Sequence, residues 1–161
     1  MPLAPFQTAL GSCILTWEGD RVTGFALPDP SGAPVAPAEE PPPWVGALLL
    51  RVARHLAGDL QDFADLPYAF DRVSPFQRRV YEAALTVKAG HTSTYGELAT
   101  RLGLGPAGSR AVGTALGLNP WPLLIPCHRF VGADGRMTGF SAPGGVATKA
   151  RLLAIEGATW F

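Results

Sequence analysis

Two stretches near the N-terminus carry the kinds of apolar and polar residues that favour β-strands. Residues 8–17 and 21–27 are rich in β-branched and aromatic side chains, and the short turn Glu18-Gly19-Asp20 separates them. Such runs, joined by a Gly-containing turn, predict an antiparallel hairpin. The Pro-rich segment 28–43 that follows predicts a loop.

Apolar residues recur at helical spacing in the next segment. Between residues 44 and 60 they occupy positions 45, 48, 49, 52, 53 and 56. This spacing predicts an amphipathic helix, and Gly58 is expected to end it.

A second helix is predicted to begin at Ser74. Serine is a favoured N-cap residue and Pro75 is a favoured first helical residue, so the pair is a strong start signal. The apolar pattern continues to about Lys88, and Gly90 is expected to stop the helix. A domain boundary is therefore predicted near residue 73.

Two short helices separated by a glycine-bearing turn are predicted next. Thr94 can cap the first of them, with Glu97 in its first turn, and residues 102–106 form the turn. The second helix, 108–116, is rich in small residues. The pattern is typical of a helix–turn–helix, although an ordinary helical hairpin would look similar. Small side chains would let this helix approach a DNA groove closely, where Arg110 could reach bases or phosphates.

The composition indicates a folded, water-soluble chain. Of the 161 residues 47% are hydrophobic and 16% charged, with no net charge, which excludes a disordered protein. No uncharged apolar run approaches the roughly 18 residues of a membrane span. The N-terminal residues lack the basic and apolar regions of a signal peptide. We therefore expect a cytoplasmic protein.

Charge is distributed unevenly between the two halves of the chain. Residues 1–73 carry four basic against nine acidic side chains, whereas residues 74–161 carry nine basic against four acidic ones. Such asymmetry indicates that the C-terminal half meets a polyanion.

The two cysteines lie in different contexts. Cys13 falls in a strand-like run without basic neighbours and is expected to be a small buried apolar residue. Cys127 lies in Pro126-Cys127-His128-Arg129, where a base and a positive charge could stabilise a nucleophilic thiolate. Two cysteines and three histidines without clustered spacing argue against a metal site, and no disulfide framework is expected.

Asn119-Pro120 followed by Pro126-Cys127-His128-Arg129 resembles the active-site signature of the O6-alkylguanine-DNA alkyltransferases, also called methylated-DNA–protein-cysteine methyltransferases. The resemblance covers residues 74–158, and residues 6–73 resemble the family's N-terminal domain in outline only. Further motifs occur in the family's order and approximate spacing: Thr94–Ala99, Arg110–Ala115 and Lys149–Gly157.

The resemblance implies an α/β protein of two domains. Residues 1–73 would form a ribonuclease-H-like structural domain, and residues 74–161 a mainly helical DNA-binding and alkyl-acceptor domain with a winged helix-turn-helix-like motif. The protein would flip O6-alkylguanine out of double-stranded DNA and transfer the alkyl group irreversibly to Cys127. Each molecule would react once, as a monomer and without an external cofactor. The zinc ligands of some family members are not evident here, so no metal is expected.

The resemblance also assigns roles to four residues around the reaction. Cys127 would attack the alkyl carbon, while His128 takes the thiol proton through a bridging water and Glu156 orients His128. Asn119 would brace the backbone turn beside the cysteine. In a strand, neighbouring side chains point to opposite faces, so a direct contact between Cys127 and His128 would need a bend or a water.

Other residues are implied to hold the flipped base and the DNA. Tyr95 would lie near the lesion phosphate and aid base extrusion, and Arg110 would fill the gap left in the base stack. The implied substrate-binding residues are Tyr95, Arg129, Phe140, Ser141 and Lys149, and the implied DNA-binding residues are Thr94, Arg110, Ala111 and Gly113. Phe140 stands where many relatives have tyrosine, and Ala142-Pro143 lengthens the same loop, so the range of alkyl groups stays open.

Three alternative functions compete with alkyl transfer. Related DNA-damage sensors bind alkylated DNA without reacting, but they replace the motif cysteine, which this chain retains as Cys127. A transcriptional regulator would use the helix–turn–helix alone. A cysteine hydrolase would use a Cys-His-Glu triad on an ester or peptide.

Overall fold

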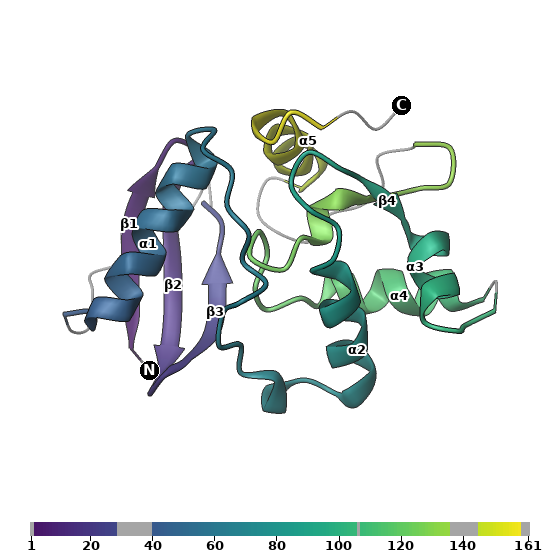
Figure 1. Cartoon of the computed structure of the whole chain (residues 1–161), viewed down its shortest axis with the longest axis horizontal. Helices are drawn as coiled ribbons and strands as arrows, with labels where there is room; N and C mark the ends of the chain where they lie inside the picture. The colour runs from purple at the N-terminus through teal and green to yellow at the C-terminus, as the bar shows by residue number, and fades with distance from the viewer. Residues whose placement is uncertain (1, 29–39, 106, 136–144, 159–161) are drawn as a thin grey trace.

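A small antiparallel sheet and a group of helices lie side by side in the computed structural model, which describes residues 2–28, 40–105, 107–135 and 145–158 (Figure 1). Helix α1 packs on the sheet, and β3 is the strand nearest to the remaining helices. The elements are β1 (Leu3–Thr8), β2 (Gly11–Glu18), β3 (Arg21–Ala26), α1 (Pro43–Leu56), the 3₁₀ helix η1 (Phe70–Arg72), α2 (Pro75–Ala84), β4 (Ser93–Thr94), α3 (Tyr95–Arg101), α4 (Gly108–Gly117), the 3₁₀ helix η2 (Cys127–Arg129), β5 (Phe130–Val131) and α5 (Gly145–Ile155).

The predicted hairpin is confirmed by the β2–β3 pair. The two strands are antiparallel with Glu18 opposite Arg21, and Gly19 adopts a φ of 61° in the turn between them. Only glycine takes this left-handed conformation without steric cost. A register shift between Thr16 and Trp17 adds a bulge to β2.

The first strand is one that the sequence pattern did not predict. The predicted strand 8–17 was wrong as a single element, because its first residue, Thr8, ends β1, the chain then turns, and β2 pairs back antiparallel to β1. Pro5 is the reason this strand was missed. Proline has no backbone N–H to donate to a neighbouring strand and normally argues against strand structure. In the sheet order β1-β2-β3, however, β1 is an edge, where a proline can be accommodated.

Helix α1 confirms the predicted amphipathic helix. The spacing of its apolar residues places Val45, Leu48 and Val52 on one buried face. The helix ends at Leu56, and Gly58 follows with a φ of 102°, the left-handed geometry expected of the glycine that stops it.

Helix α2 begins as predicted but ends earlier. The Ser74 side chain accepts a hydrogen bond from the Gln77 backbone N–H, and the Gln77 side chain caps the Ser74 N–H in return. The predicted extension to Lys88 was wrong, because the helix ends at Ala84. The chain then turns so that the carbonyl of Val87 accepts a hydrogen bond from Arg129, a distant residue that local periodicity cannot anticipate.

The two short helices predicted on either side of a glycine-bearing turn are confirmed as α3 and α4. Thr94 caps α3 by accepting from the Glu97 N–H, and Gly103 turns the chain with a φ of 76°. A Cβ on Gly108 would lie 2.5 Å from the Cβ of Leu104. Glycine at the start of α4 is therefore what allows the turn to pack this closely.

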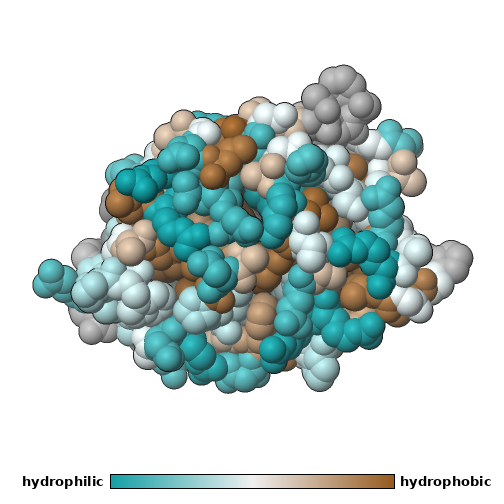
Figure 2. Space-filling view, in the orientation of Figure 1, coloured by the Kyte–Doolittle hydropathy of each residue, from teal (hydrophilic) through white to brown (hydrophobic). Residues whose placement is uncertain are grey.

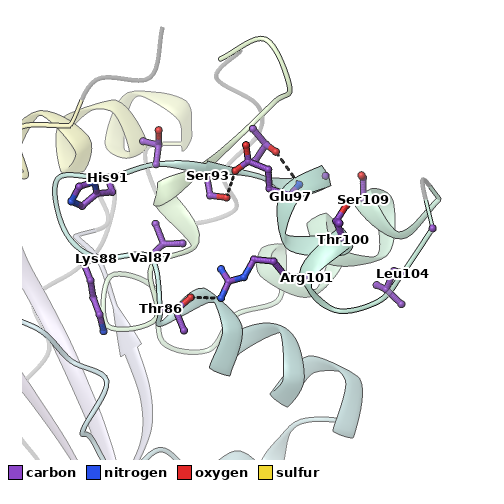
Figure 3. A pocket seen from close by; sticks show the side chains of 14 residues that line it. Thr86, Val87, Lys88, His91, Ser93, Glu97, Thr100, Arg101, Leu104 and Ser109 are labelled. Carbon is purple, nitrogen blue, oxygen red and sulfur yellow. Dashed lines mark hydrogen bonds between the residues drawn. The ribbon is translucent and has the colours of Figure 1, made fainter.

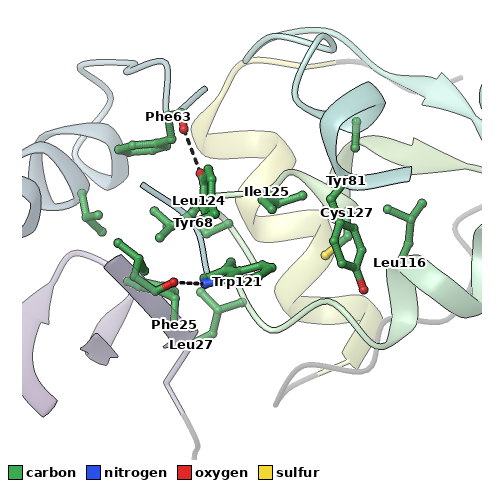
Figure 4. Close-up of a cluster of buried hydrophobic side chains, with 14 of the residues drawn as sticks. Phe25, Leu27, Phe63, Tyr68, Tyr81, Leu116, Trp121, Leu124, Ile125 and Cys127 are labelled. Atoms are coloured by element: carbon green, nitrogen blue, oxygen red, sulfur yellow. Dashed lines mark hydrogen bonds between the residues drawn. The ribbon is translucent and has the colours of Figure 1, made fainter. Parts of the chain in front are cut away.

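One continuous apolar core joins the sheet side of the molecule to the helical side (Figure 4). At its centre, the buried Trp121 donates a hydrogen bond from Nε1 to the carbonyl of Val22 in β3. The rings of Tyr68, Phe70 and Tyr81 surround Trp121 with centroids 5.4 to 6.1 Å away. The predicted boundary near residue 73 stays a prediction, since this core spans it.

The surface presented in Figure 2 mixes hydrophilic and hydrophobic residues without one dominant apolar area. Within the described ranges, no helix has the length and apolar character needed to cross a membrane. Most of the predicted loop 28–43 lies outside the residues that the structure describes, and so do Phe140 and Ser141, two of the implied substrate-binding residues.

Candidate functional site

The segment that leads to Cys127 is a tight turn held by one amide side chain. Asn119 donates from Nδ2 to the carbonyl of Ile125 at 2.9 Å, and its Oδ1 accepts from the Trp121 N–H at 2.9 Å. Leu123, within the turn, has a φ of 79°, which residues other than glycine seldom adopt, and its side chain is fully buried. The bracing role predicted for Asn119 matches these contacts.

Replacing Asn119 with alanine is expected to lower the free energy of unfolding by about 2 kcal/mol, because two hydrogen bonds that hold the strained turn are lost. Chemical denaturation measures the loss. Asn119→Asp keeps the acceptor for Trp121 but sets an oxygen against the Ile125 carbonyl, so it should not restore stability. A loss below about 0.5 kcal/mol for the alanine variant would contradict the bracing role.

The Cys127-His128-Arg129 signature forms one turn of 3₁₀ helix rather than part of a strand. The side chains of Cys127 and His128 are therefore not restricted to opposite faces, as strand geometry would require. The structure gives no hydrogen bond from Nδ1 of His128 to Cys127, so the water-bridged proton path stays a prediction. All three side chains are buried.

Burial raises the pKa of the Cys127 thiol, since a thiolate is poorly solvated inside the protein. The Asn119 side chain, the positive charge of Lys149 and the backbone N–H groups of Cys127 and His128 all favour the thiolate and oppose that effect. Tyr81 lies beside the cysteine (Figure 4) and donates to the carbonyl of Ala115 at 2.7 Å. Burial, followed by the nearby Cys127 charge, raises the pKa of Tyr81 to about 12, so Tyr81 stays neutral.

Glu156 accepts hydrogen bonds from four donor atoms, which belong to three residues in two segments of the chain. Arg129 makes a bidentate pair with it, from Nε to Oε1 at 2.9 Å and from Nη2 to Oε2 at 2.8 Å. The Nε2 atoms of His55 and His128 lie 2.8 and 3.0 Å from Oε2. Burial would raise the pKa of Glu156, but the hydrogen bonds from His128, His55 and Arg129 outweigh it and hold the pKa well below its usual range. Glu156 is therefore an anion.

The ionised Glu156 determines which nitrogen of His128 carries the proton. Since a carboxylate only accepts hydrogen bonds, Nε2 of His128 must be the donor to it. Burial lowers the pKa of His128, although Glu156 opposes the shift, so the ring is neutral and Nδ1 carries a lone pair. Nδ1 is buried and has no hydrogen-bond partner among the described residues. It can therefore accept a proton.

Lys149 and Tyr95 meet beside the reactive turn. The fully buried Lys149 projects from α5, and its Nζ lies 3.3 Å from the Tyr95 hydroxyl, within reach to donate. The ammonium also lies 5.6 Å from the centre of the Tyr95 ring. Tyr95 is the first residue of α3. The contact thus links the predicted base-binding lysine to the predicted DNA-binding helix pair.

Three of the four residues predicted to meet DNA lie on α4. Arg110 and Ala111 are exposed, and Gly113 lies against Tyr95, whose Cδ1 would be 3.9 Å from a Cβ at that position. Thr94 is partly buried at the N-cap of α3. The exposed side of α4 therefore carries mostly small side chains, and Arg110 in its first turn is the long basic one.

A groove of about 1040 Å³ lies next to these helices rather than at Cys127 (Figure 3). Its walls come from the segment after α2, from α3 and from the start of α4, including Lys88, Arg101 and Ser109. Arg101 crosses one end of the groove and donates to the Thr86 hydroxyl.

No group of three or more His, Cys, Asp or Glu residues in the described ranges is placed to hold a metal ion.

Comparison with known proteins decides the family. The family model described as "6-O-methylguanine DNA methyltransferase, DNA binding domain" matches residues 75–158. The chain belongs to this methyltransferase family.

Named proteins and a solved structure are similar to this chain over most of its length. A protein of Mycolicibacterium paratuberculosis named methylated-DNA–protein-cysteine methyltransferase is 42% identical over 73% of this chain and 68% of its own. One of Thermus thermophilus, named DNA base-flipping protein, is 45% identical over 70% of this chain and 76% of its own. The crystal structure of Mycobacterium tuberculosis OGT in complex with DNA covers 96% of this chain and 92% of its own at 33% identity, with a TM-score of 0.79. The resemblance stated from the sequence is thereby confirmed.

Most of the predicted catalytic residues lie together in the structure, but Arg129 has a different environment from the one predicted. Cys127, His128, Glu156 and Asn119 gather in one place, whereas Arg129, predicted to contact substrate, is buried with its guanidinium on Glu156 and the Val87 carbonyl. His55 was missed altogether. It lies three residues after Val52 on the apolar face of α1, and a polar residue at a buried helical position needs a partner, which is the signal that could have found it.

Proposed function

We propose that the chain repairs O6-alkylguanine in double-stranded DNA by transferring the alkyl group to Cys127. The observation that carries this proposal is the buried His128 next to the signature cysteine, fixed by Glu156 with its Nδ1 lone pair available. This is the arrangement of nucleophile, base and orienting group that activates a cysteine. Family membership and the DNA-bound relative support the choice of substrate.

The reaction follows from these groups. The thiol proton of Cys127 passes through a water to Nδ1 of His128, and the sulfur attacks the alkyl carbon. A carbon–sulfur bond forms while the carbon–O6 bond breaks, and its electron pair stays on guanine. Guanine takes up a proton, for which the Tyr95 hydroxyl is the proposed donor. The carbon–sulfur bond of the thioether is not broken again, so each molecule reacts once. The reaction needs no cofactor.

Because Cys127 is buried, its thiolate is expected to form only when the sulfur reacts. A permanently charged sulfur would be costly in this apolar environment, and the pKa of Cys127 is accordingly raised. Asn119, Lys149 and the backbone N–H groups instead lower the cost of forming the negative charge. Alkylation then removes that charge.

Binding would use the exposed face of α4. The helix pair is proposed to act as a winged helix-turn-helix-like reader, with Thr94, Ala111 and Gly113 near the backbone of the DNA and Arg110 in place of the flipped base. Phe140, Ser141 and Lys149 are proposed to hold the extruded guanine. A ribonuclease-H-like N-terminal domain, a monomeric state and a cytoplasmic location complete the proposal.

The proposal is tested by mixing the protein with an excess of duplex that carries one O6-methylguanine and measuring the guanine restored. At most one guanine per protein molecule should be restored, without added cofactor. Repeated turnover would contradict self-alkylation. Lesion binding without restoration would place the chain with the DNA-damage sensors.

Replacing Arg110 with alanine is expected to slow repair of the duplex about tenfold or more, because nothing then offsets the cost of base flipping. Reaction with a free O6-alkylguanine base, which needs no flipping, should keep its rate. Arg54→Ala removes the same charge from an exposed position on α1 and serves as the control. Equal losses on duplex and free base would contradict the role of Arg110.

A further inference from the structure

His55 connects the N-terminal part of the chain to the reactive centre. It lies near the end of α1, its side chain is fully buried, and 101 residues separate it from Glu156, whose Oε2 it contacts at 2.8 Å. None of the steps described above uses it. A buried imidazole in contact with a carboxylate that orients a proton acceptor is nevertheless placed to influence the reaction.

The direction of the hydrogen bond between His55 and Glu156 is determined by its other partner. The backbone N–H of Gln61 points at Nδ1 of His55 at 3.0 Å. A backbone N–H can only donate, so Nδ1 must accept and the ring proton must be on Nε2. His55 is therefore a neutral donor to Glu156, and it requires no charge of its own.

The donors hold Glu156 between two parts of the fold. His128 and Arg129 reach it from η2, whereas His55 reaches the same Oε2 atom from α1. We infer that His55 is a positioning residue for alkyl transfer: by donating to Glu156 from α1, it fixes the carboxylate so that Glu156 holds His128 with Nδ1 toward the thiol proton. This inference rests on the proposed function.

A consequence for pH dependence follows from the same contacts. The titratable and charged groups that act on His128 are Glu156, directly after α5, Arg129 from its own turn, and His55 from α1. Without the hydrogen bond from His55, the carboxylate of Glu156 interacts more strongly with a protonated His128. The pKa of His128 is therefore expected to rise. Since only neutral His128 can accept the thiol proton, the acid limb of the transfer rate should move to higher pH.

The test compares His55→Phe with His55→Gln in single-turnover transfer at saturating lesion duplex. Phenylalanine fills the space without a donor, whereas glutamine can place an amide N–H near the position of Nε2. We expect His55→Phe to slow transfer about tenfold, the factor for losing one hydrogen bond to a charged group, and to shift its acid limb upward. His55→Gln should recover most of the rate. Affinity for lesion DNA should change less than about twofold in both, because His55 lies away from α4.

Two comparisons separate positioning from mere loss of stability. Val52→Ala creates a cavity in the same buried face of α1 and should lower the unfolding temperature without changing the transfer rate constant. In a Glu156→Gln background, His55→Phe should cost no further rate, because its effect passes through the carboxylate. An equal, additive loss in that background would overturn the inference.

Nitrogen-15 spectra of the histidine rings test the tautomer directly. The chain has three histidines, and His91→Gln removes the signals of the one outside this cluster. We expect His55 to show a protonated Nε2 and an unprotonated Nδ1. A ring protonated at Nδ1, or His55→Gln no faster than His55→Phe, would overturn the inference. If the unaltered protein transfers nothing to Cys127, the proposed function itself has failed, whatever the spectra show.

Discussion

Replacing Cys127 with serine is expected to abolish alkyl transfer while lesion-containing DNA is still bound. A hydroxyl holds its proton far more tightly than a thiol, and oxygen is a poorer nucleophile than sulfur toward saturated carbon. The transfer rate should fall by at least about 10⁴-fold, the scale seen when a nucleophile is removed from a catalytic group. Single-turnover assays measure the rate, and gel-shift titration measures the binding.

Cys13 provides the matched control for this change. It is fully buried in β2, burial raises its pKa to about 11, and Thr8 lies 3.7 Å from its sulfur. Burial outweighs the opposing Thr8 hydrogen bond and keeps the Cys13 thiol protonated, so Cys13→Ser should keep full transfer. Residual transfer in Cys127→Ser, or loss of transfer in Cys13→Ser, would contradict the assignment of Cys127 as the acceptor.

Glu156→Gln is expected to lower the free energy of unfolding by about 3 to 5 kcal/mol, the cost of leaving a buried charge without its partner. The guanidinium of Arg129 is buried and loses its bidentate counter-ion, while His55 and His128 lose a charged acceptor. Transfer should slow as well, because His128 is no longer held with Nδ1 as acceptor. Denaturant titration and single-turnover kinetics measure the two effects.

The exposed pair of Arg78 and Glu82 offers a comparison for Glu156. These side chains lie 3.3 Å apart on α2, and both are about half exposed. Glu82→Gln makes the same chemical change as Glu156→Gln and should cost no more than about 0.5 kcal/mol. Similar losses at the two sites would contradict the importance given to the buried cluster.

The stability of the protein should also depend on pH through Glu156. Its pKa in the folded protein lies far below the ordinary value of 4.5. On acidification the unfolded chain therefore takes up this proton first, which favours unfolding. The contribution of Glu156 is fully present above about pH 4.5 and is lost as the pH falls below it. Glu156→Gln should flatten the decline of stability over that acid range.

Local sequence signals predicted the parts of the fold that depend on neighbours in the chain. The hairpin around Gly19, the amphipathic face of α1 and the capping box at Ser74 each follow from residues a few positions apart. The edge strand with Pro5 and the early end of α2 did not. Both depend on distant partners, the neighbouring strand in one case and Arg129 in the other.

The same distinction explains what could be predicted of the site. Cys127, His128, Asn119 and Glu156 came from the resemblance, and their clustering agrees with it. The 3₁₀ turn at Cys127 was not foreseen, because its short apolar context reads like a strand. His55 was not foreseen either, since its partner lies 101 residues away and only the folded chain brings them together.

The central claim is that Cys127 accepts the alkyl group. The most direct measurement is the intact mass of the protein after reaction with a duplex that carries one O6-methylguanine, followed by peptide mapping. The account predicts one methyl group per molecule in place of the Cys127 thiol hydrogen, with Cys13 unmodified. Restored guanine without a methylated Cys127 peptide, or a methyl group on any other residue, would contradict it.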